Sequence, residues 1–524
     1  MAAGGASATG GGREAANVAA GILLTRVLGY VRERVFAYYF GNSAAADAFR
    51  AALRIPNAIR NLLGEGTLSA SFIPVYAALN DRPDKGASRA LAGAVLGLLL
   101  LATGVLAVLG IAFAPAITTA IAPGFDGPKK QLTILLVRIL FPMTGLMVVS
   151  AWCLGVLNSH RRFFLPYAAP ALWNVAGIAA LVGAAAWLGS RDLPLNEQMY
   201  RLALALAWGT VAGSVLQIAV QVPACWRLLQ GIALRFDTAP EGVRDVLVAW
   251  LPLVFGAGVA QVSGLVDTFL GSFTGEGGLS SLGYAQLLQV LPISLFGVSV
   301  AAVSLPDLAR DAAGATPNEL LRARVASGFR RIGYFVVPSS FLFAALGPVI
   351  VGALFQTGRF GTSDTELVGG VLAAYGVGLL GQATVKLFAS GFYALRDTRT
   401  PVKIATLSLV LSTGLAALLM RRYGPAGIAL GSSLGAWVNV VLHLRDLDRR
   451  IGAVLGRVEW RAAAVTFLAA GAAAAGSVGA AHFAASLAPI PLALLALVIF
   501  GVTYIVLTLA LKHPDAASLW KFIR

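Results

Sequence analysis

A long apolar stretch at residues 17–80 carries six arginines, and this constrains the chain more than any other feature. The stretch is long enough for two membrane-spanning helices, which need about 20 apolar residues each. An arginine at the bilayer centre costs roughly 2.5–3.5 kcal/mol on insertion scales, so six would cost on the order of 15–20 kcal/mol. They must therefore face a wet cavity, one another or an anionic ligand. The six are Arg26, Arg32, Arg34, Arg50, Arg54 and Arg60, opposed by Glu33, Asp47 and Glu65.

Helical spacing gathers polar side chains on one face of the second of these helices. At about 100° per residue, five of them fall within about 80° of arc, and Arg60 flanks them. The five are Arg50, Arg54, Asn57, Asn61 and Glu65. In the preceding helix, Arg26 and Glu33 share a face. In the second helix, Pro56 should introduce a kink, and Gly64 and Gly66 should loosen the C-terminal end. A broken helix with an arginine stripe predicts a polar site within the membrane.

The composition is that of an all-α integral membrane protein. Of 524 residues, 58% are hydrophobic and 12% charged, with a mean hydropathy of +0.78. Fourteen apolar runs are long enough to span a bilayer. Residues 1–16 lack the features of a cleavable signal peptide, so we expect a disordered tail there. Cys153 and Cys225 are expected to be small core residues.

The basic residues of the connecting loops predict the orientation. With the N-terminus inside, 25 lysines and arginines lie in cytoplasmic segments and seven in external ones. Both termini should therefore be cytoplasmic. The net charge of +16 then reflects mostly topology, so no nucleic-acid partner is expected.

Short motifs repeat six spans apart and indicate two lobes of the same orientation. Residues 55–60 (IPNAIR) resemble 305–310 (LPDLAR), and the basic turn before Pro166 resembles the one before Pro401. Parallel repeats are a transporter pattern. The expected organisation is an N-lobe at 17–228, a cytoplasmic linker at 229–244, a C-lobe at 245–443, a basic loop at 444–461, two further helices at 462–511 and a cytoplasmic tail at 512–524.

The motifs closely resemble the MurJ (MviN) lipid II flippase family. They are TRVLGYVRERVFAYYFG, AADAF and RIPNAIRNLLGEGTLSASFIPVYA, followed by LNSHRRFFLPYAAPALWN, LFQTGRF and VKLFASGFYALRDTRTPVKI. The resemblance implies fourteen transmembrane helices, in two six-helix lobes around a central cationic cavity plus two C-terminal helices that form a groove for a lipid tail. It implies a flippase of the multidrug/oligosaccharidyl-lipid/polysaccharide exporter superfamily. Such a protein moves the undecaprenyl-diphosphate-linked peptidoglycan precursor outward by alternating access.

The resemblance also implies roles for individual residues. Cavity arginines and their neighbours form the expected substrate site, two acidic residues are expected to gate it through salt bridges, and Asp267 is a candidate for cation coupling. The resemblance supplies Arg26, Arg32, Arg60 and Glu65 of the substrate-binding set, and the polar face of the second helix adds Arg54 and Asn57. The gating set is Glu33 and Asp47. One position departs from the family, because Tyr284-Ala285-Gln286-Leu287 lacks the arginine expected in the eighth helix.

Several alternatives stay open. Internal pairing of Arg26 with Glu33, or of Arg54 or Arg60 with Glu65, would make the charges purely structural. Against that, guanidinium stays charged and binds phosphate oxygens bidentately, which suits a diphosphate. Asp267 suits either a sodium or proton site or helix packing. A flippase for another polyprenyl-diphosphate glycan and a non-transporting scaffold are the competing functions.

An enzyme is not expected. The chain has no recognisable nucleophile–base constellation, phosphate loop or cluster of metal ligands. We therefore expect no metal and no cofactor, with a coupled sodium ion or proton as the one open alternative. The expected partners are a lipid-linked anionic substrate and membrane lipids, bound by a monomer.

Overall fold

The computed structural model describes residues 6–64, 66–189, 191, 193–301, 310 and 317–516, which are helical with no strand among them. Thirteen helical segments in this part of the chain are long and apolar enough to cross a membrane. Helix α1 (Ala6–Phe40) is also long enough but carries four charged residues between positions 26 and 34. The all-α membrane architecture is confirmed, and thirteen segments together with α1 are consistent with the expected fourteen spans.

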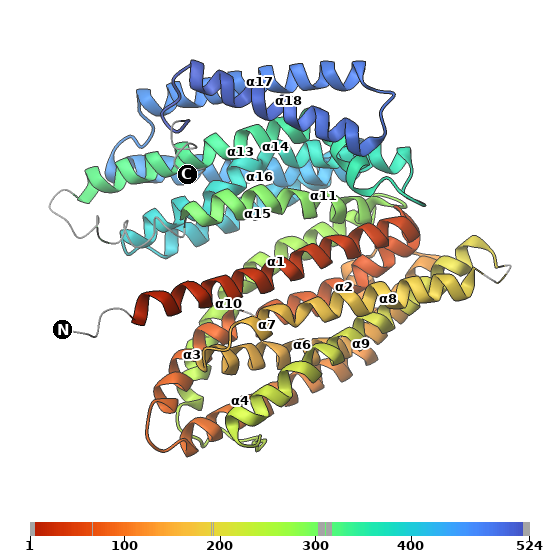
Figure 1. Cartoon of the computed structure of the whole chain (residues 1–524), viewed down its shortest axis with the longest axis vertical. Helices are drawn as coiled ribbons and strands as arrows, with labels where there is room; N and C mark the ends of the chain where they lie inside the picture. The colour runs from red at the N-terminus through yellow and green to blue at the C-terminus, as the bar shows by residue number, and fades with distance from the viewer. Residues whose placement is uncertain are drawn as a thin grey trace. The chain divides into compact units, whose positions relative to one another are not determined.

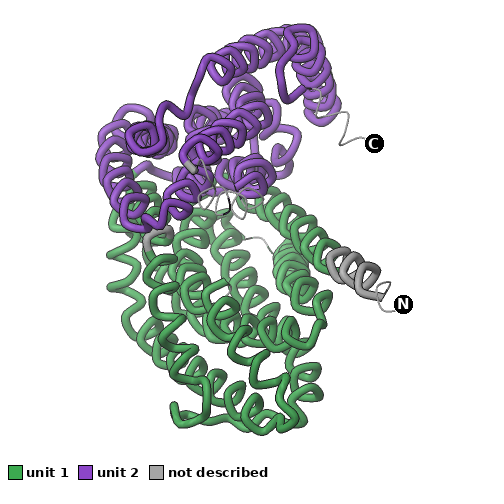
Figure 2. Tube along the Cα trace, turned by 90° about the vertical axis from the view of Figure 1, so that its left-hand side faces the viewer, with its two compact units in different colours: residues 1–273 green, residues 274–524 purple. Residues whose placement is uncertain are grey.

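The chain divides into two compact units, Met1–Phe273 and Thr274–Arg524 (Figure 2). Figure 1 labels their helices. Unit 1 contains α1, α2 (Ala44–Leu63), α3 (Thr67–Asn80), α4 (Gly86–Ala112), α5 (Ala114–Ile121), α6 (Gly127–Ser159), α7 (Phe164–Ala168), α8 (Pro170–Leu188), α9 (Leu195–Leu229) and α10 (Val243–Gly271). Unit 2 contains α11 (Gly278–Pro292), the π-helical turn η1 (Ile293–Val298), α13 (Pro317–Phe355), α14 (Thr362–Ala394), α15 (Arg399–Tyr423), α16 (Pro425–Ile451), α17 (Arg457–Phe483) and α18 (Pro489–Ala510).

The core of unit 1 forms where α3, α4, α6 and α9 meet. Phe72 and Tyr76 of α3 stack on each other with ring centroids 5.1 Å apart, and they pack with the fully buried Trp152 of α6. The Trp152 indole Nε1 donates to the Ala92 carbonyl of α4 at 3.1 Å, so its one polar group is satisfied. Cys153 and Cys225 are buried and free in this core, as predicted.

The core of unit 2 lies between α13, α14 and α16. Leu321, Phe388 and Leu447 are completely buried there. Glycines allow the helices to approach closely: a Cβ at Gly378 of α14 would overlap Ser433 of α16. Small residues at such contacts are typical of membrane helix packing. Helices α17 and α18 form an antiparallel pair against α13 (Figure 1).

The polar second span breaks into two helices at its glycines. Helix α2 ends at Leu63 and α3 begins at Thr67, with Gly66 at a φ of +84° that favours glycine. The predicted loosening at Gly64 and Gly66 is therefore confirmed. Pro56 lies buried inside α2, about two turns before this break.

The expected internal repeat has a structural counterpart at two helix ends. Arg161 follows α6 and Arg396 follows α14, and both adopt a left-handed φ of +57°. In both turns the next residue's N–H bonds back to the carbonyl five positions earlier: Arg162 to Leu157, and Asp397 to Phe392. This is the same C-terminal cap in each unit.

The units divide at residue 273, because α10 packs against α2, α3 and α5 of unit 1. The expected lobe boundaries at 228 and 245 stay a prediction. Helix α1 begins at Ala6, within the segment expected to be disordered, since helical geometry there continues N-terminally from the apolar span.

Candidate functional site

A charged cluster joins α1 to α2 in unit 1. The Glu33 carboxylate accepts from Arg32 Nη2 at 2.7 Å and from Arg50 Nη2 at 2.9 Å. Its side chain is 13% exposed, and those of Arg32 and Arg50 are 25% and 18% exposed. Two guanidinium groups share one carboxylate, so the cluster keeps an excess positive charge. Glu33 therefore forms salt bridges as expected, while its role in gating stays a prediction.

The predicted alternative pairing of Arg26 with Glu33 is wrong, since Glu33 binds Arg32 and Arg50. Seven residues of helix separate Arg26 from Glu33 by about 10 Å along the axis, whereas Arg50 reaches across from the neighbouring helix. Arg26 itself is exposed on α1. Among the described residues, no ion pair joins Arg26 or Arg60 to the cluster.

Aromatic rings hold the two arginines in place. The Arg32 Cζ atom lies 4.4 Å from the centre of the Trp173 ring of α8, and the Arg50 Cζ atom lies 5.1 Å from that of Phe36. Such cation–π contacts are worth roughly 0.5–2 kcal/mol. A cavity of about 40 Å³ lies beside these groups, bounded also by Thr210 of α9. It is large enough for a water molecule next to the guanidinium groups.

The remaining part of the polar face of α2 meets α10. A Cβ at Gly264 of α10 would overlap the guanidinium of Arg54, so this glycine makes room for the arginine. The Asn61 Nδ2 atom donates to Gln261 Oε1 at 3.4 Å, one turn earlier on α10. Asp267 is three residues beyond Gly264 and therefore lies on the same side of α10. The structure thus places Asp267 on the face that Arg54 approaches.

Other predicted site residues lie on α2 or just beyond it. Asn57 and Arg60 are half-buried, and the Arg60 Nε atom is buried with no hydrogen-bond partner among the described residues. Glu65 lies outside the described residues, so its expected pairing with Arg54 or Arg60 stays a prediction. The structure therefore brings Arg32 together with Glu33 and Arg50. It places Arg54 against the side of α10 that carries Gly264 and Asp267.

Asp47 forms a salt bridge, as expected, but the sequence analysis did not predict its partner, Lys129. Its fully buried Oδ2 atom accepts from Lys129 Nζ at 2.6 Å, and that ammonium lies 4.0 Å from the centre of the Phe125 ring. Lys129 was expected in an external loop, but it lies in the first turn of α6. Trp173 and Arg50 were also missing from the expected binding set. The one sequence feature that could have added Arg50 to the set was its position on the polar face of the second helix.

The position that departs from the family lies in unit 2. Leu287 is half-buried in α11, and its neighbour Gln286 donates from Nε2 to the Tyr375 hydroxyl at 3.0 Å. Tyr284 is completely buried against Phe355 and Phe360. The glutamine at position 286 is thus part of the internal packing of unit 2.

The fold defines the class of protein. The structure matches a solved lipid II flippase MurJ in an inward closed conformation with a TM-score of 0.76 at 21% identity, covering 97% of this chain and 99% of that one. It also matches an inward-facing multidrug resistance MATE family transporter of the MOP superfamily with a TM-score of 0.65 at 18% identity, covering 82% and 95%. The chain therefore has the fold of the polytopic transporters of this superfamily.

Sequence comparison gives the family. The family model "Lipid II flippase MurJ" matches residues 36–506. The lipid II flippase MurJ of Burkholderia cenocepacia is 35% identical over 434 residues, which cover 82% of each chain. The probable lipid II flippase MurJ of Haemophilus influenzae is 33% identical over 443 residues, covering 82% of this chain and 84% of its own. The chain belongs to the lipid II flippase MurJ family, and it is a multi-pass membrane protein.

Proposed function

We propose that this protein translocates lipid II, the undecaprenyl-diphosphate-linked peptidoglycan precursor, from the cytoplasmic to the outer leaflet of a bacterial inner membrane by alternating access. Membership of the family and the excess positive charge at Glu33, Arg32 and Arg50 support this function. The protein makes and breaks no covalent bond in this proposal. It acts as a monomer, and nucleic acid has no part in its function.

The arginines recognise the diphosphate. Arg32 keeps N–H donors beyond the one that binds Glu33, because a guanidinium carries five. Arg26, Arg54 and Arg60 add charge along α1 and α2, while Asn57 and Glu65 orient them. Each charge-assisted contact to phosphate contributes roughly 1.5–3 kcal/mol. Loss of one arginine should then weaken substrate binding about tenfold to a hundredfold.

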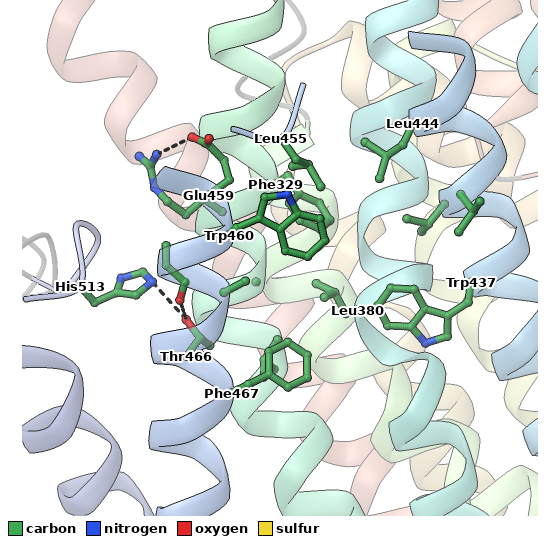
Figure 3. A pocket seen from close by; sticks show the side chains of 17 residues that line it. Phe329, Leu380, Trp437, Leu444, Leu455, Glu459, Trp460, Thr466, Phe467 and His513 are labelled. Atoms are coloured by element: carbon green, nitrogen blue, oxygen red, sulfur yellow. Dashed lines mark hydrogen bonds and ion pairs between the residues drawn. The ribbon is translucent and has the colours of Figure 1, made fainter. Parts of the chain in front are cut away.

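An apolar cavity in unit 2 suits part of the lipid tail. It has a volume of about 280 Å³ and lies between α13, α14, α16 and α17, with Leu380, Trp437 and Phe467 in its wall (Figure 3). At the polar edge of the cavity, the Arg330 guanidinium pairs with Glu459 at 3.4 Å and with Asp515 at 2.9 Å. We assign this cavity, beside the C-terminal helix pair, to a segment of the polyprenyl chain.

Both termini are cytoplasmic in this proposal, which rests on the excess of basic residues in alternate loops. Reporter domains fused in the loops that precede α6 and α14 should then be external. Cytoplasmic labelling of either loop would overturn the orientation.

Complementation tests the transport function. The chain should restore growth to a strain depleted of its own lipid II flippase, and Arg32→Ala should fail at equal membrane expression. Arg32→Lys should rescue partly, since it keeps the charge but loses the bidentate geometry. Arg201→Ala is the matched control, because Arg201 forms an exposed pair with Glu197 at 2.6 Å.

The outcomes also separate the competing functions. Full growth of a variant with alanine at Arg26, Arg32 and Arg60 would remove these arginines from the substrate site. Failure of the unmodified chain, with no flipping of any polyprenyl-diphosphate glycan in vesicles, would favour a non-transporting scaffold. Failure of the unmodified chain, together with flipping of another polyprenyl-diphosphate glycan in vesicles, would move the substrate to that glycan.

A further inference from the structure

A cationic cavity lies at one end of α6 and α9 in unit 1, away from the Glu33 cluster. It has a volume of about 570 Å³, within the usual range for ligand sites. Arg161 and Arg162 line it from the turn after α6, and Arg227 lines it from the last turn of α9. Phe163, Phe164 and Leu165 supply an apolar wall. None of the described residues that line the cavity is acidic.

The backbone fixes two of these arginines in place. Arg161 adopts a left-handed φ of +57°, where glycine is the usual residue of such a helix cap. The Arg161 N–H bonds to the Asn158 carbonyl at 3.0 Å, and the Arg162 N–H bonds to the Leu157 carbonyl at 2.8 Å. These bonds hold the backbone of the turn from which both side chains extend.

The surroundings are those of a membrane interface. The Trp226 side chain, adjacent to Arg227, is 55% exposed, and that of Phe164 is 49% exposed. Tryptophan and tyrosine concentrate at the level of lipid headgroups, so the exposed Trp226 is typical of that level. The positive-inside pattern assigns this end of α6 and α9 to the cytoplasmic side, where anionic lipids attract basic residues.

We propose that this cavity binds an anionic glycerophospholipid of the inner leaflet. The phosphate group contacts Arg161, Arg162 and Arg227, and the upper part of one acyl chain lies against Phe163 and Phe164. Basic pockets between membrane helices on the cytoplasmic side bind such headgroups. Charge complementarity and the mixed lining favour a lipid over a soluble anion, which would have no use for the apolar wall. The site is independent of the proposed transport function.

Binding of phosphatidylglycerol to the purified full-length protein tests the assignment. Phosphatidylglycerol should raise the melting temperature of the protein in detergent, whereas phosphatidylcholine at the same concentration should not. Each basic residue near a membrane surface contributes about a fivefold change in affinity, so replacing all three arginines by glutamine should weaken phosphatidylglycerol binding on the order of a hundredfold. Arg162→Gln and Arg227→Gln singly should each weaken it about fivefold.

A matched control removes the same charge elsewhere. Arg235, Arg244 and Arg457 are exposed and lie outside the cavity, so their combined replacement by glutamine should leave phosphatidylglycerol binding unchanged. Circular dichroism without added lipid checks that each variant is folded. If the triple variant is not folded, the two single variants provide the test of phosphatidylglycerol binding. Equal loss in both triple variants, no loss in either, or equal protection by inorganic phosphate would overturn the proposal.

Discussion

Lys129 Nζ lies 2.6 Å from Asp47 Oδ2, and the Asp47 side chain has no exposure to solvent. The pair ties the first turn of α2 to the first turn of α6, two helices that pack along each other. Asp47 also follows the N-cap Ser43, whose hydroxyl accepts from the Ala46 N–H at 3.3 Å. A buried carboxylate near a helix N-terminus is stabilised by the helix dipole as well as by the lysine.

Asp47→Asn should destabilise the protein by about 3 kcal/mol, because it leaves the Lys129 ammonium buried without its counter-charge. Thermal unfolding in detergent measures the effect. Combining Asp47→Asn with Lys129→Met should recover much of the loss, since neither charge then remains buried. The exposed pair of Glu197 and Arg201 is the control, and Glu197→Gln should cost less than about 1 kcal/mol. Equal losses of stability at the two pairs would contradict the expectation that burial makes the loss of a counter-charge more costly.

Gly264→Ala should displace Arg54, because the added methyl group would overlap the guanidinium. If Arg54 takes part in substrate binding, lipid II transport should fall about tenfold while expression is unchanged. Gly256→Ala is the matched control in the same helix, as a Cβ there meets nothing within 4 Å. Vesicle-based flipping measures both variants. Normal flipping in Gly264→Ala would remove Arg54 from the site.

Helical periodicity predicted the polar face of α2 but not its partners. Arg50, Arg54 and Asn61 do share one side of the helix, because side chains three and four residues apart lie together. Their contacts are Glu33 on α1 and Gly264 and Gln261 on α10. Asn61 and Gln261 are 200 positions apart, and tertiary packing alone decides such a contact.

The spans were predictable for a different reason. Their apolar length exceeds what a bilayer requires, so it identifies helices without any knowledge of packing. Lys129 shows the limit of that reasoning: a lysine next to Pro128 at the edge of a span is expected in a loop. Only the three-dimensional arrangement brings it to a carboxylate 82 positions earlier.

The pH dependence of stability should include a contribution from His513, which follows α18. Its Nδ1 accepts from the Asp515 N–H at 3.1 Å, and its Nε2 pairs with the Thr466 hydroxyl at 3.1 Å, so the ring is held neutral. Burial lowers the pKa of His513, an effect that Asp515 opposes and Arg330 reinforces. A lowered folded pKa means that the unfolded chain binds the proton more tightly.

Stability should therefore be complete above the unfolded pKa of about 6.5 and should fall as the pH drops below it. Melting temperatures between pH 5 and 8 measure this, and His513→Gln should flatten the curve. His482→Gln is the control, because His482 is exposed at the end of α17. A curve that keeps its slope without His513 would assign the effect to another group.

Asp267 provides the test of cation coupling. Its position beyond Gly264 puts it on the side of α10 that Arg54 approaches, so its carboxylate has two candidate roles, a cation site or a counter-charge to Arg54. If a cation couples to transport through Asp267, Asp267→Asn should abolish the dependence of flipping on sodium or on the proton gradient. If Asp267 acts only through Arg54, the variant should lower flipping equally at every sodium concentration and pH. The double variant Arg54→Gln with Asp267→Asn separates the two cases. If Asp267 couples a cation, the double variant should still lack the dependence on sodium or on the proton gradient. If Asp267 acts only through Arg54, the double variant should flip lipid II as well as Arg54→Gln alone, because the charge that Asp267 balanced is gone.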